Sequence, residues 1–576
     1  MTHRRIRWLG VLLGAVLLAL GGCVVIPTSG PVEHHDQQHQ TSEPGVEIAP
    51  APPPPGASPS LIVEGFLHAM ATYQPDYGAA RKYLTTQAAA VWRPESGVQV
   101  YADTSPSVGE RAATLAAPLV GRLDPHGTYT TVDGAVRVDF GLVREAGQWR
   151  VSTPPEGLLI SAYLFANSYV PVNLYFLDPT GTTLVPDLVF QPRSLRGLSA
   201  AANGLVRGPS NWLAPAVTTA FPAGSHFVDG RVVVDTAGVA AVNLDAGLRS
   251  LDAGQRARLA AQLVWTLSGF EGVTGIRINA GGEPLVVTQA DASGLISRSA
   301  MAAWAPIHPQ LSTQLFVATR TGLARIVDGT RQTSAEAVPG PLGRLSDING
   351  LALSRDGQQA AVTLSGGSLL FGQVGDAEPT GLDTGGAVVR PQFDRFDALW
   401  TFTKGPKSEA RYWVSGKLLS TSSPATSDAS VVAFKIAPDG VRVAIVAVTG
   451  GRQVLGMARI VRGNRQVRIE GWQPLLSPAP GQPQPIDVGW ATDSILLVAR
   501  TDAAGSGSIV RLDAAGSQSQ EIGPSDLGHP AGLAVSPGSP AYRAAVVSES
   551  GDAYRYDAEF RWPLLWQGVS QAAYPG

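Results

Sequence analysis

Cysteine is almost absent from this chain of 576 residues, which contains a single one, Cys23. An intrachain disulfide needs two cysteines and a cysteine-based zinc site needs several, so the sequence excludes both. The folded part of the chain must therefore be held together by packing and hydrogen bonds alone.

Charged residues are also scarce. Asp, Glu, Lys and Arg make up 15% of the chain, and its formal net charge at pH 7 is −3. Three of the arginines, Arg4, Arg5 and Arg7, lie near the N-terminus, so the rest of the chain is more acidic still. No basic stripe remains to follow a phosphate backbone, and nucleic acid is therefore not a predicted partner.

Enzyme signatures are missing as well. The chain has no Gly-x-Ser-x-Gly elbow, no His-Glu-x-x-His motif and no P-loop. We predict no enzyme, no cofactor and no metal centre, although a Ser/His/Asp triad need not be close in sequence. The histidines beyond residue 59 are scattered without the spacing of metal ligands: His68, His126, His226, His308 and His529.

Glycine and proline, in contrast, are abundant, with 65 and 44 copies, and hydrophobic residues make up 44% of the chain. This composition favours short strands joined by turns. The chain is longer than the roughly 250–300 residues that one hydrophobic core can serve, so we expect about three domains.

The single cysteine stands directly behind an apolar run. Residues 1–7 are basic, residues 8–20 are apolar, and two glycines precede Cys23, which is the layout of a signal peptide over residues 1–22. The apolar run spans only about 20 Å as a helix, too short for a bilayer core of about 30 Å. The string LGGC resembles the lipobox of bacterial lipoproteins. This resemblance implies a diacylglyceryl thioether on Cys23, which anchors the chain at the extracytoplasmic face of the cell membrane.

Residues 23–59 are predicted to be a lipid anchor followed by a proline-rich tether. The stretch APAPPPPGASP favours polyproline II, and few residues here can contribute to a core. His34, His35 and His39 could bind a metal. A solvated polar linker is the favoured interpretation, because a disordered tether cannot preorganise ligands.

Residues 60–157 are expected to form a small α+β domain. One helix begins at Ser60 as its N-cap, and residues 75–94 predict a second helix with one apolar face. The stretch AVRVDFGLV alternates like a strand, and a last strand near Pro155 would close an antiparallel sheet. The order of helices before sheet resembles cystatin-like folds. The predicted apolar face of the second helix consists of Ala80, Leu84, Ala88 and Val91.

Residues 165–292 are predicted to form a second α+β unit. LYFLDPTG begins a strand pair, ANGLVRGPS ends a helix at Gly208, and a second long helix has Asp252 as its N-cap. These strings, with VVVDTAGVAAVNLD and AAQLVWTLSGFEGVTGIRI, resemble the GerMN domain of spore-germination lipoproteins. That family is a binding or assembly module without established chemistry, so the resemblance implies no active site.

Residues 298–570 contain a weak repeat of a small strand, a turn and an apolar strand. Its copies are about 46 residues apart on average, which fits a four-stranded blade of a β-propeller. We predict five to seven blades, with six or seven favoured. Closure into a ring would leave no sheet edge exposed. The aligned positions are Ala305, Ser354, Phe393, Ala437, Trp490 and Ser536.

Some propeller residues could be mistaken for an active site. Asp356 and Asp439 could be catalytic carboxylates, but they lie in the repeated turns SRDG and APDG and are expected to be structural. Several tryptophans could stack on sugars, but the interior of the blades is their favoured place. These are Trp400, Trp413, Trp472 and Trp490.

The order of the segments resembles LpqB, a family of actinobacterial lipoproteins, and AARKYLTTQAAAVWRP is similar to that family's N-terminal domain. The resemblance implies a multidomain fold with an α+β N-terminal domain, an α+β GerMN-like domain and an all-β propeller. It also implies a partner, the extracytoplasmic part of the sensor kinase MtrB of the MtrAB two-component system. Modulation of that kinase would influence cell-wall and division homeostasis. Two alternatives stay open: a sensor that binds a cell-wall ligand and, less favoured, a hydrolase acting on the cell wall.

Overall fold

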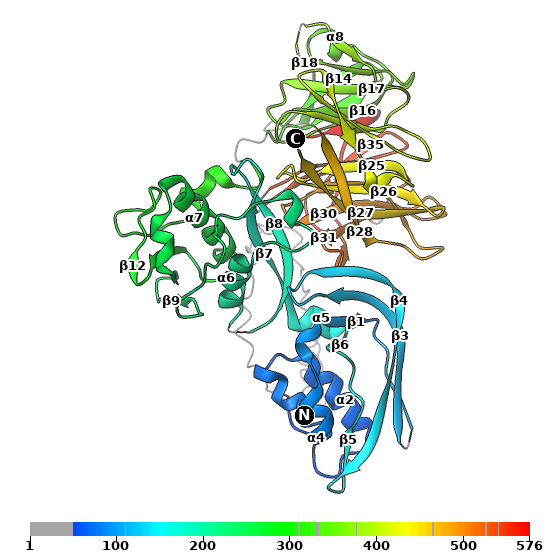
Figure 1. Cartoon of the computed structure of the whole chain (residues 1–576). Helices are drawn as coiled ribbons and strands as arrows, with labels where there is room; N and C mark the ends of the chain where they lie inside the picture. Colours follow the sequence, from blue (N-terminus) through cyan, green and yellow to red (C-terminus); the bar gives the residue numbers. More distant parts are fainter. Residues whose placement is uncertain are drawn as a thin grey trace, which may run out of the picture. The chain divides into compact units, whose positions relative to one another are not determined.

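The computed structural model describes residues 50–576, except 110, 195, 309–311, 329–332, 376, 464–465, 525–526 and 539–540. Residues 50–576 form one compact unit, whose elements are labelled in Figure 1. The predicted signal peptide, Cys23, and the tether histidines His34, His35 and His39 lie outside the described residues.

The first helix of the N-terminal domain, α2 (Pro59–Ala71), has the predicted apolar face but a different cap. Ile62, Phe66 and Ala69 are buried. The N-cap is Ser58 and not Ser60, because the Ser58 hydroxyl accepts the backbone N–H of Leu61 at 3.4 Å.

The second predicted helix is broken into α3 (Gly78–Arg81) and α4 (Thr86–Val91). Thr85 divides them, because its hydroxyl caps α4 by accepting the Ala88 N–H at 3.1 Å. Ala80, Leu84 and Ala88 are buried as predicted. Val91 is 69% exposed, so its assignment to the apolar face is wrong.

The sheet of this domain is mixed, whereas the sequence predicts an antiparallel one. Its strands follow the order β5-β4-β3-β1-β6, and β6 pairs with β1 in parallel. The chain continues beyond Pro155 into β6, because β3 occupies one edge of β1 and only the other edge is free. The strands are β1 (Val98–Tyr101), β3 (Ala112–Leu123), β4 (Tyr129–Glu145), β5 (Gln148–Val151) and β6 (Leu158–Ser161).

The GerMN-like unit contains the predicted elements. The antiparallel hairpin of β7 (Tyr169–Leu177) and β8 (Leu184–Pro192) packs with α6 (Gly197–Arg207) and α7 (Ala253–Leu267) around one apolar core. Asp252 caps α7 in a reciprocal capping box with Gln255, as its sequence predicts. The remaining strands form the sheet β12-β11-β10-β9: β9 (Val233–Val234), β10 (Val239–Leu244), β11 (Gly275–Ala280) and β12 (Glu283–Pro284).

The described residues of the C-terminal part form six sheets of a β-propeller, within the predicted range. The innermost strands end at or next to five of the predicted repeat positions, such as Ser354 and Ser536. Gly357 and Gly440 in the repeated turns have φ of 73° and 75°, which explains why these turns carry glycine. The innermost strands include β16 (Ile348–Leu353), β20 (Gln392–Phe393), β25 (Ser430–Ile436), β29 (Gln484–Trp490) and β33 (Pro530–Ser536).

The ring is closed by the end of the chain, which differs from the predicted repeat at Ala305. Ala305 follows a 3-10 helix and begins no strand. The sixth innermost strand is instead β37 (Val569–Ala573), which pairs with β13 (Phe316–Thr319) from the start of the propeller. The first and last segments of the propeller therefore share one blade.

Candidate functional site

The two aspartates of the repeated turns are structural. The Asp356 carboxylate accepts hydrogen bonds from the Ser354 hydroxyl at 2.6 Å and the Gln358 N–H at 2.9 Å, and these bonds lower its pKa. Asp439 is fully buried and is ion-paired with Arg442 at 2.6 Å. Asp356 is exposed and Asp439 is buried, and both carboxylates accept hydrogen bonds from their own turns, as the structural interpretation expects.

The four tryptophans pack in or against the interior of the blades, as predicted. Trp400, Trp413 and Trp490 are almost fully buried, and Trp472 is half-buried against a blade core. The described residues include no group of three metal-ligating side chains. In the same residues, no helix is long and apolar enough to cross a membrane.

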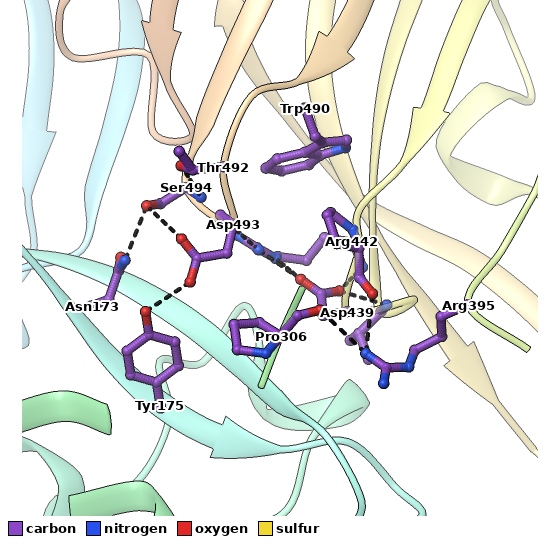
Figure 2. Close-up of polar contacts among 12 residues, drawn as sticks. Asn173, Tyr175, Pro306, Arg395, Asp439, Arg442, Trp490, Thr492, Asp493 and Ser494 are labelled. Atoms are coloured by element: carbon purple, nitrogen blue, oxygen red, sulfur yellow. Dashed lines mark hydrogen bonds and ion pairs between the residues drawn. The ribbon is translucent and has the colours of Figure 1, made fainter. Parts of the chain in front are cut away.

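A polar cluster joins the GerMN-like unit to the propeller, and we call it the junction. The Tyr175 hydroxyl donates to the Asp493 carboxylate at 2.7 Å, and the Asn173 amide donates to the Ser494 hydroxyl at 3.0 Å. Figure 2 shows both side chains of β7 pointing toward this propeller turn. Burial, and then the nearby Asp493 charge, raise the pKa of Tyr175 well above its ordinary value, so it stays a donor at physiological pH.

Arg442 is the centre of the junction on the propeller side. Its guanidinium binds the Asp439 carboxylate, donates to the backbone oxygen of Asp493, and stacks 4.9 Å from the ring centroid of Trp490. These contacts hold the turn that carries Asp493 in place from the propeller side (Figure 2). A buried ion pair with its remaining donors satisfied is costly to break by removing one partner.

Trp212 locks the same two units at a second point. Its indole N–H donates to the Gly471 carbonyl, and its own carbonyl accepts the Arg459 guanidinium at 2.6 Å. Its ring packs against both the GerMN-like core and the core of a propeller blade. Trp212 therefore combines apolar burial with two hydrogen bonds across the junction.

The N-terminal domain, the GerMN-like unit and the propeller together surround a small cavity of about 40 Å³. Tyr129, Asp187 and Arg442 line it, one from each unit. Burial raises the pKa of Asp187, whereas hydrogen bonds from the Ser210 N–H and hydroxyl, at 2.6 and 2.9 Å, act in the opposite direction. All three units thus share contacts near Arg442.

The central channel of the propeller contains a second set of charges. One guanidinium nitrogen of Arg390 donates to both carboxylate oxygens of Asp487, at 2.8 and 2.7 Å. Lys435 lies beside this pair, and its ammonium donates to the backbone oxygen of Gly576 at 2.7 Å. Burial, and then the neighbouring Arg390 charge, lower the pKa of Lys435 to about 7.

Of the junction residues, sequence reasoning pointed only to Asp439 and Trp490, as structural residues of the propeller, and it pointed to none of the channel charges. Tyr175 lies in a predicted strand, and Asp493 and Lys435 lie in repeat segments. The sequence did not indicate their roles, because their hydrogen-bond partners are far away in the chain. One sequence signal existed, since Lys435 is among only a few lysines of the chain and stands in a strand of apolar neighbours.

Comparisons with known proteins agree with this architecture. The family described as "Lipoprotein LpqB, N-terminal domain" matches residues 52–166, and "Lipoprotein LpqB beta-propeller domain" matches residues 323–575. The family described as "Sporulation and spore germination" matches residues 173–286.

Whole-chain relatives match over almost the full length. Lipoprotein LpqB of Cutibacterium acnes is 32% identical, covering 97% of this chain and 98% of its own. Lipoprotein LpqB of Streptomyces coelicolor is 28% identical, covering 98% and 96%. Among solved structures, the first GerMN domain of the sporulation protein GerM from Bacillus subtilis is 21% identical, with a TM-score of 0.20, and covers 23% of this chain and 98% of that one.

An N-terminal α+β domain, a GerMN domain and a C-terminal β-propeller define the class of multidomain protein to which this chain belongs. The chain belongs to the LpqB lipoprotein family. The predicted family resemblance, the GerMN domain and the propeller are thereby confirmed.

Proposed function

We propose that the protein is a membrane-anchored accessory lipoprotein that binds and modulates the extracytoplasmic part of a two-component sensor kinase, MtrB, without catalysing a reaction. The observation that supports this most is the junction. Because Tyr175 and Trp212 connect the GerMN domain to the propeller, the domains can present one continuous binding surface and not separate, independently moving ones.

The anchor completes the proposal. Lipidation of Cys23 would confine the protein to the extracytoplasmic face of the membrane, where the kinase also lies. Confinement raises the effective concentration of the two proteins for each other without any new contact. The bound protein can shift signalling only by the difference in its affinity for two states of the kinase.

A Cys23→Ala variant tests the anchor. We expect the variant to leave the membrane fraction, whereas Ser29→Ala in the same tether stays there. In crosslinking pulldowns from intact membranes, a sensor kinase should be the main partner of the native chain and should be lost with Cys23→Ala. A variant that keeps both membrane retention and the kinase crosslink would contradict the proposal.

A second candidate function, a sensor of cell-wall ligands, is favoured by one observation. A cavity of about 530 Å³ lies beside the junction, and its lining includes Trp265, Arg298 and Asp493. This volume is in the range of small-molecule sites. Thermal-shift measurements with peptidoglycan and arabinogalactan fragments separate this candidate from a purely protein-binding role, which predicts no shift.

A further inference from the structure

A turn between the two outer strands of one propeller blade exposes a phenylalanine. The turn, residues 557–561, lies between β35 (Asp552–Arg555) and β36 (Leu564–Gln567), and we call it the Phe560 turn. Phe560 is 59% exposed, whereas the nearby Trp562 is 5% exposed. Trp562 packs against Tyr556 with ring centroids 5.1 Å apart, and Phe560 belongs to no ring pair among the described residues. The aromatic side chains on either side of the turn thus pack in the blade, and Phe560 is left exposed.

The backbone of Phe560 has a conformation that favours glycine. Its φ is 60°, in the left-handed region, where a bulky side chain is disfavoured. The other non-glycine residues of the described chain in this region are small or polar, except Tyr77, which is half-buried. Folding alone does not explain a bulky, exposed side chain at such a position, so the strain points to a function of the ring.

The turn holds Phe560 firmly in this position. The Ile522 carbonyl accepts two hydrogen bonds, from the Phe560 N–H at 2.8 Å and from the Trp562 indole N–H at 3.0 Å. Gly523 packs so closely that a Cβ there would lie 2.8 Å from the Phe560 Cα. An aromatic side chain on a preorganised turn loses little conformational entropy on binding, which is the property of an anchor in a protein interface.

Charges of both signs flank Phe560. Asp557 and Arg561 form an ion pair at 2.6 Å, and the Glu559 carboxylate lies 3.6 Å from the Arg511 guanidinium. All four of these side chains are at least 40% exposed. An aromatic residue inside a polar rim is typical of protein–protein interfaces. A bilayer fits this rim poorly, because two carboxylates would have to approach the lipid headgroups together with the ring.

The Phe560 turn is also continuous with a contact between domains. A side-chain amide of β32 (Ser519–Glu521) donates to Glu559 at 3.2 Å, so the turn lies against the neighbouring blade. In that blade, the turn between β31 (Gly507–Asp513) and β32 contacts the N-terminal domain, since the Thr131 hydroxyl donates to the Ala515 carbonyl at 3.4 Å. One blade therefore uses this turn to bind a domain of the chain, and the next blade exposes an aromatic ring at the equivalent turn.

We propose that Phe560 is the anchor through which the protein docks onto the extracytoplasmic part of the sensor kinase. The ring fills an apolar pocket of the kinase, and the two flanking ion pairs complement charges of both signs around that pocket. Burial of a phenylalanine ring contributes roughly tenfold to a hundredfold to affinity. This inference rests on the proposed function and adds to it the surface that makes the contact.

The test is a titration of the full chain against the sensor kinase, with both proteins in the same detergent. Phe560→Gly should weaken binding by about tenfold to a hundredfold, because the anchor is lost. Glycine adopts a φ of 60° without steric cost, so this variant should unfold at nearly the temperature of the native chain. Loss of binding without loss of stability is a result that a merely structural role of Phe560 would not give.

Two further variants serve as controls. Phe560→Trp keeps an aromatic ring at the turn and should retain most of the affinity. Tyr163→Ala removes an aromatic side chain that is 68% exposed on the N-terminal domain, and it should leave binding unchanged. In intact membranes, a benzophenone amino acid at position 560 should crosslink to the kinase, and the same group at position 163 should not.

Three results would overturn the inference while leaving the proposed function in place. The first is undiminished kinase binding by folded Phe560→Gly, which would move the contact elsewhere. The second is a native dimer in sedimentation velocity that Phe560→Gly abolishes, which would assign the turn to a second copy. The third is binding of the Cys23→Ala chain to phospholipid vesicles that is lost when Phe560→Gly is added. Absence of kinase binding by the native chain is a different result, because it contradicts the proposed function and this inference together.

Discussion

The hydrogen bond from Tyr175 to Asp493 should stabilise the GerMN domain against the propeller by a measurable amount. Tyr175 is 5% exposed, and its ring also contacts Trp265 with centroids 5.6 Å apart. Tyr175→Phe keeps that ring contact and removes only the donor. Hydrogen bonds to charged groups contribute about 1.5–3 kcal/mol, so we expect a loss in this range.

Amide hydrogen exchange in the full chain measures this loss where it arises. The N–H groups of β7 and β8 should exchange faster in Tyr175→Phe, because opening of the hairpin away from the propeller becomes easier. A change of about 1.5–3 kcal/mol corresponds to exchange roughly tenfold to over a hundredfold faster. Amides of the sheet formed by β3 and β4, away from Tyr175, should change little.

A double-mutant cycle decides whether the effect belongs to this pair. Asp493→Ala removes the acceptor, and the combined variant should lose less than the sum of the two single variants, by about 1.5–3 kcal/mol. Tyr163→Phe, at a residue 68% exposed, is the matched control and should leave exchange unchanged. Additive effects in the cycle, or unchanged exchange in β7, would refute the reasoning.

Three further predictions concern stability. Asp252→Ala should lower the free energy of unfolding by about 1 kcal/mol in denaturant titrations, because the carboxylate caps α7. The pKa of Lys435 is about 7 in the folded chain and 10.5 ordinarily, so between these pH values the unfolded chain binds more protons than the folded chain. The free energy of unfolding should therefore rise from pH 7 to 10, and urea titrations of Lys435→Met should show a smaller rise. A Cβ at Gly322 would lie 1.9 Å from the Gly343 oxygen, so Gly322→Ala should lower the thermal midpoint more than Gly450→Ala, which shares a positive φ but meets no atom within 4 Å.

Local signals were the part of the fold that the sequence predicted well. The capping box at Asp252 and the positive φ of 100° at Gly208 are determined within three or four residues of chain. Strand alternation in AVRVDFGLV likewise depends on one buried face, and Phe140 is fully buried there. Such patterns need no knowledge of distant partners.

Pairing between distant segments was where prediction failed. β6 pairs with β1 in parallel across about sixty residues, and β37 pairs with β13 across the whole propeller. Neither strand has a sequence feature that identifies its pairing partner. The short apolar run of β6 also lacks the alternation that would show which of its faces is buried. Assigning the first repeat to Ala305 was wrong for this reason. The innermost strand of that blade is not next to β13 in the sequence but is β37, near the end of the chain.

One turn of the propeller repeat differs in sequence from the others, and the structure shows that this turn carries the junction. The turns SRDG and APDG contain an aspartate followed by glycine, and the equivalent turn of the next blade reads ATDS, with Ser494 in place of the glycine. The carboxylates of Asp356 and Asp439 accept hydrogen bonds from backbone N–H groups of their own turns. Asp493 accepts no such backbone bond among the described residues, and its carboxylate turns to Tyr175 instead (Figure 2). A blade that departs from its own repeat at a turn is therefore the place to look for a contact between domains, because the repeat accounts for the propeller alone and the exception needs a second partner.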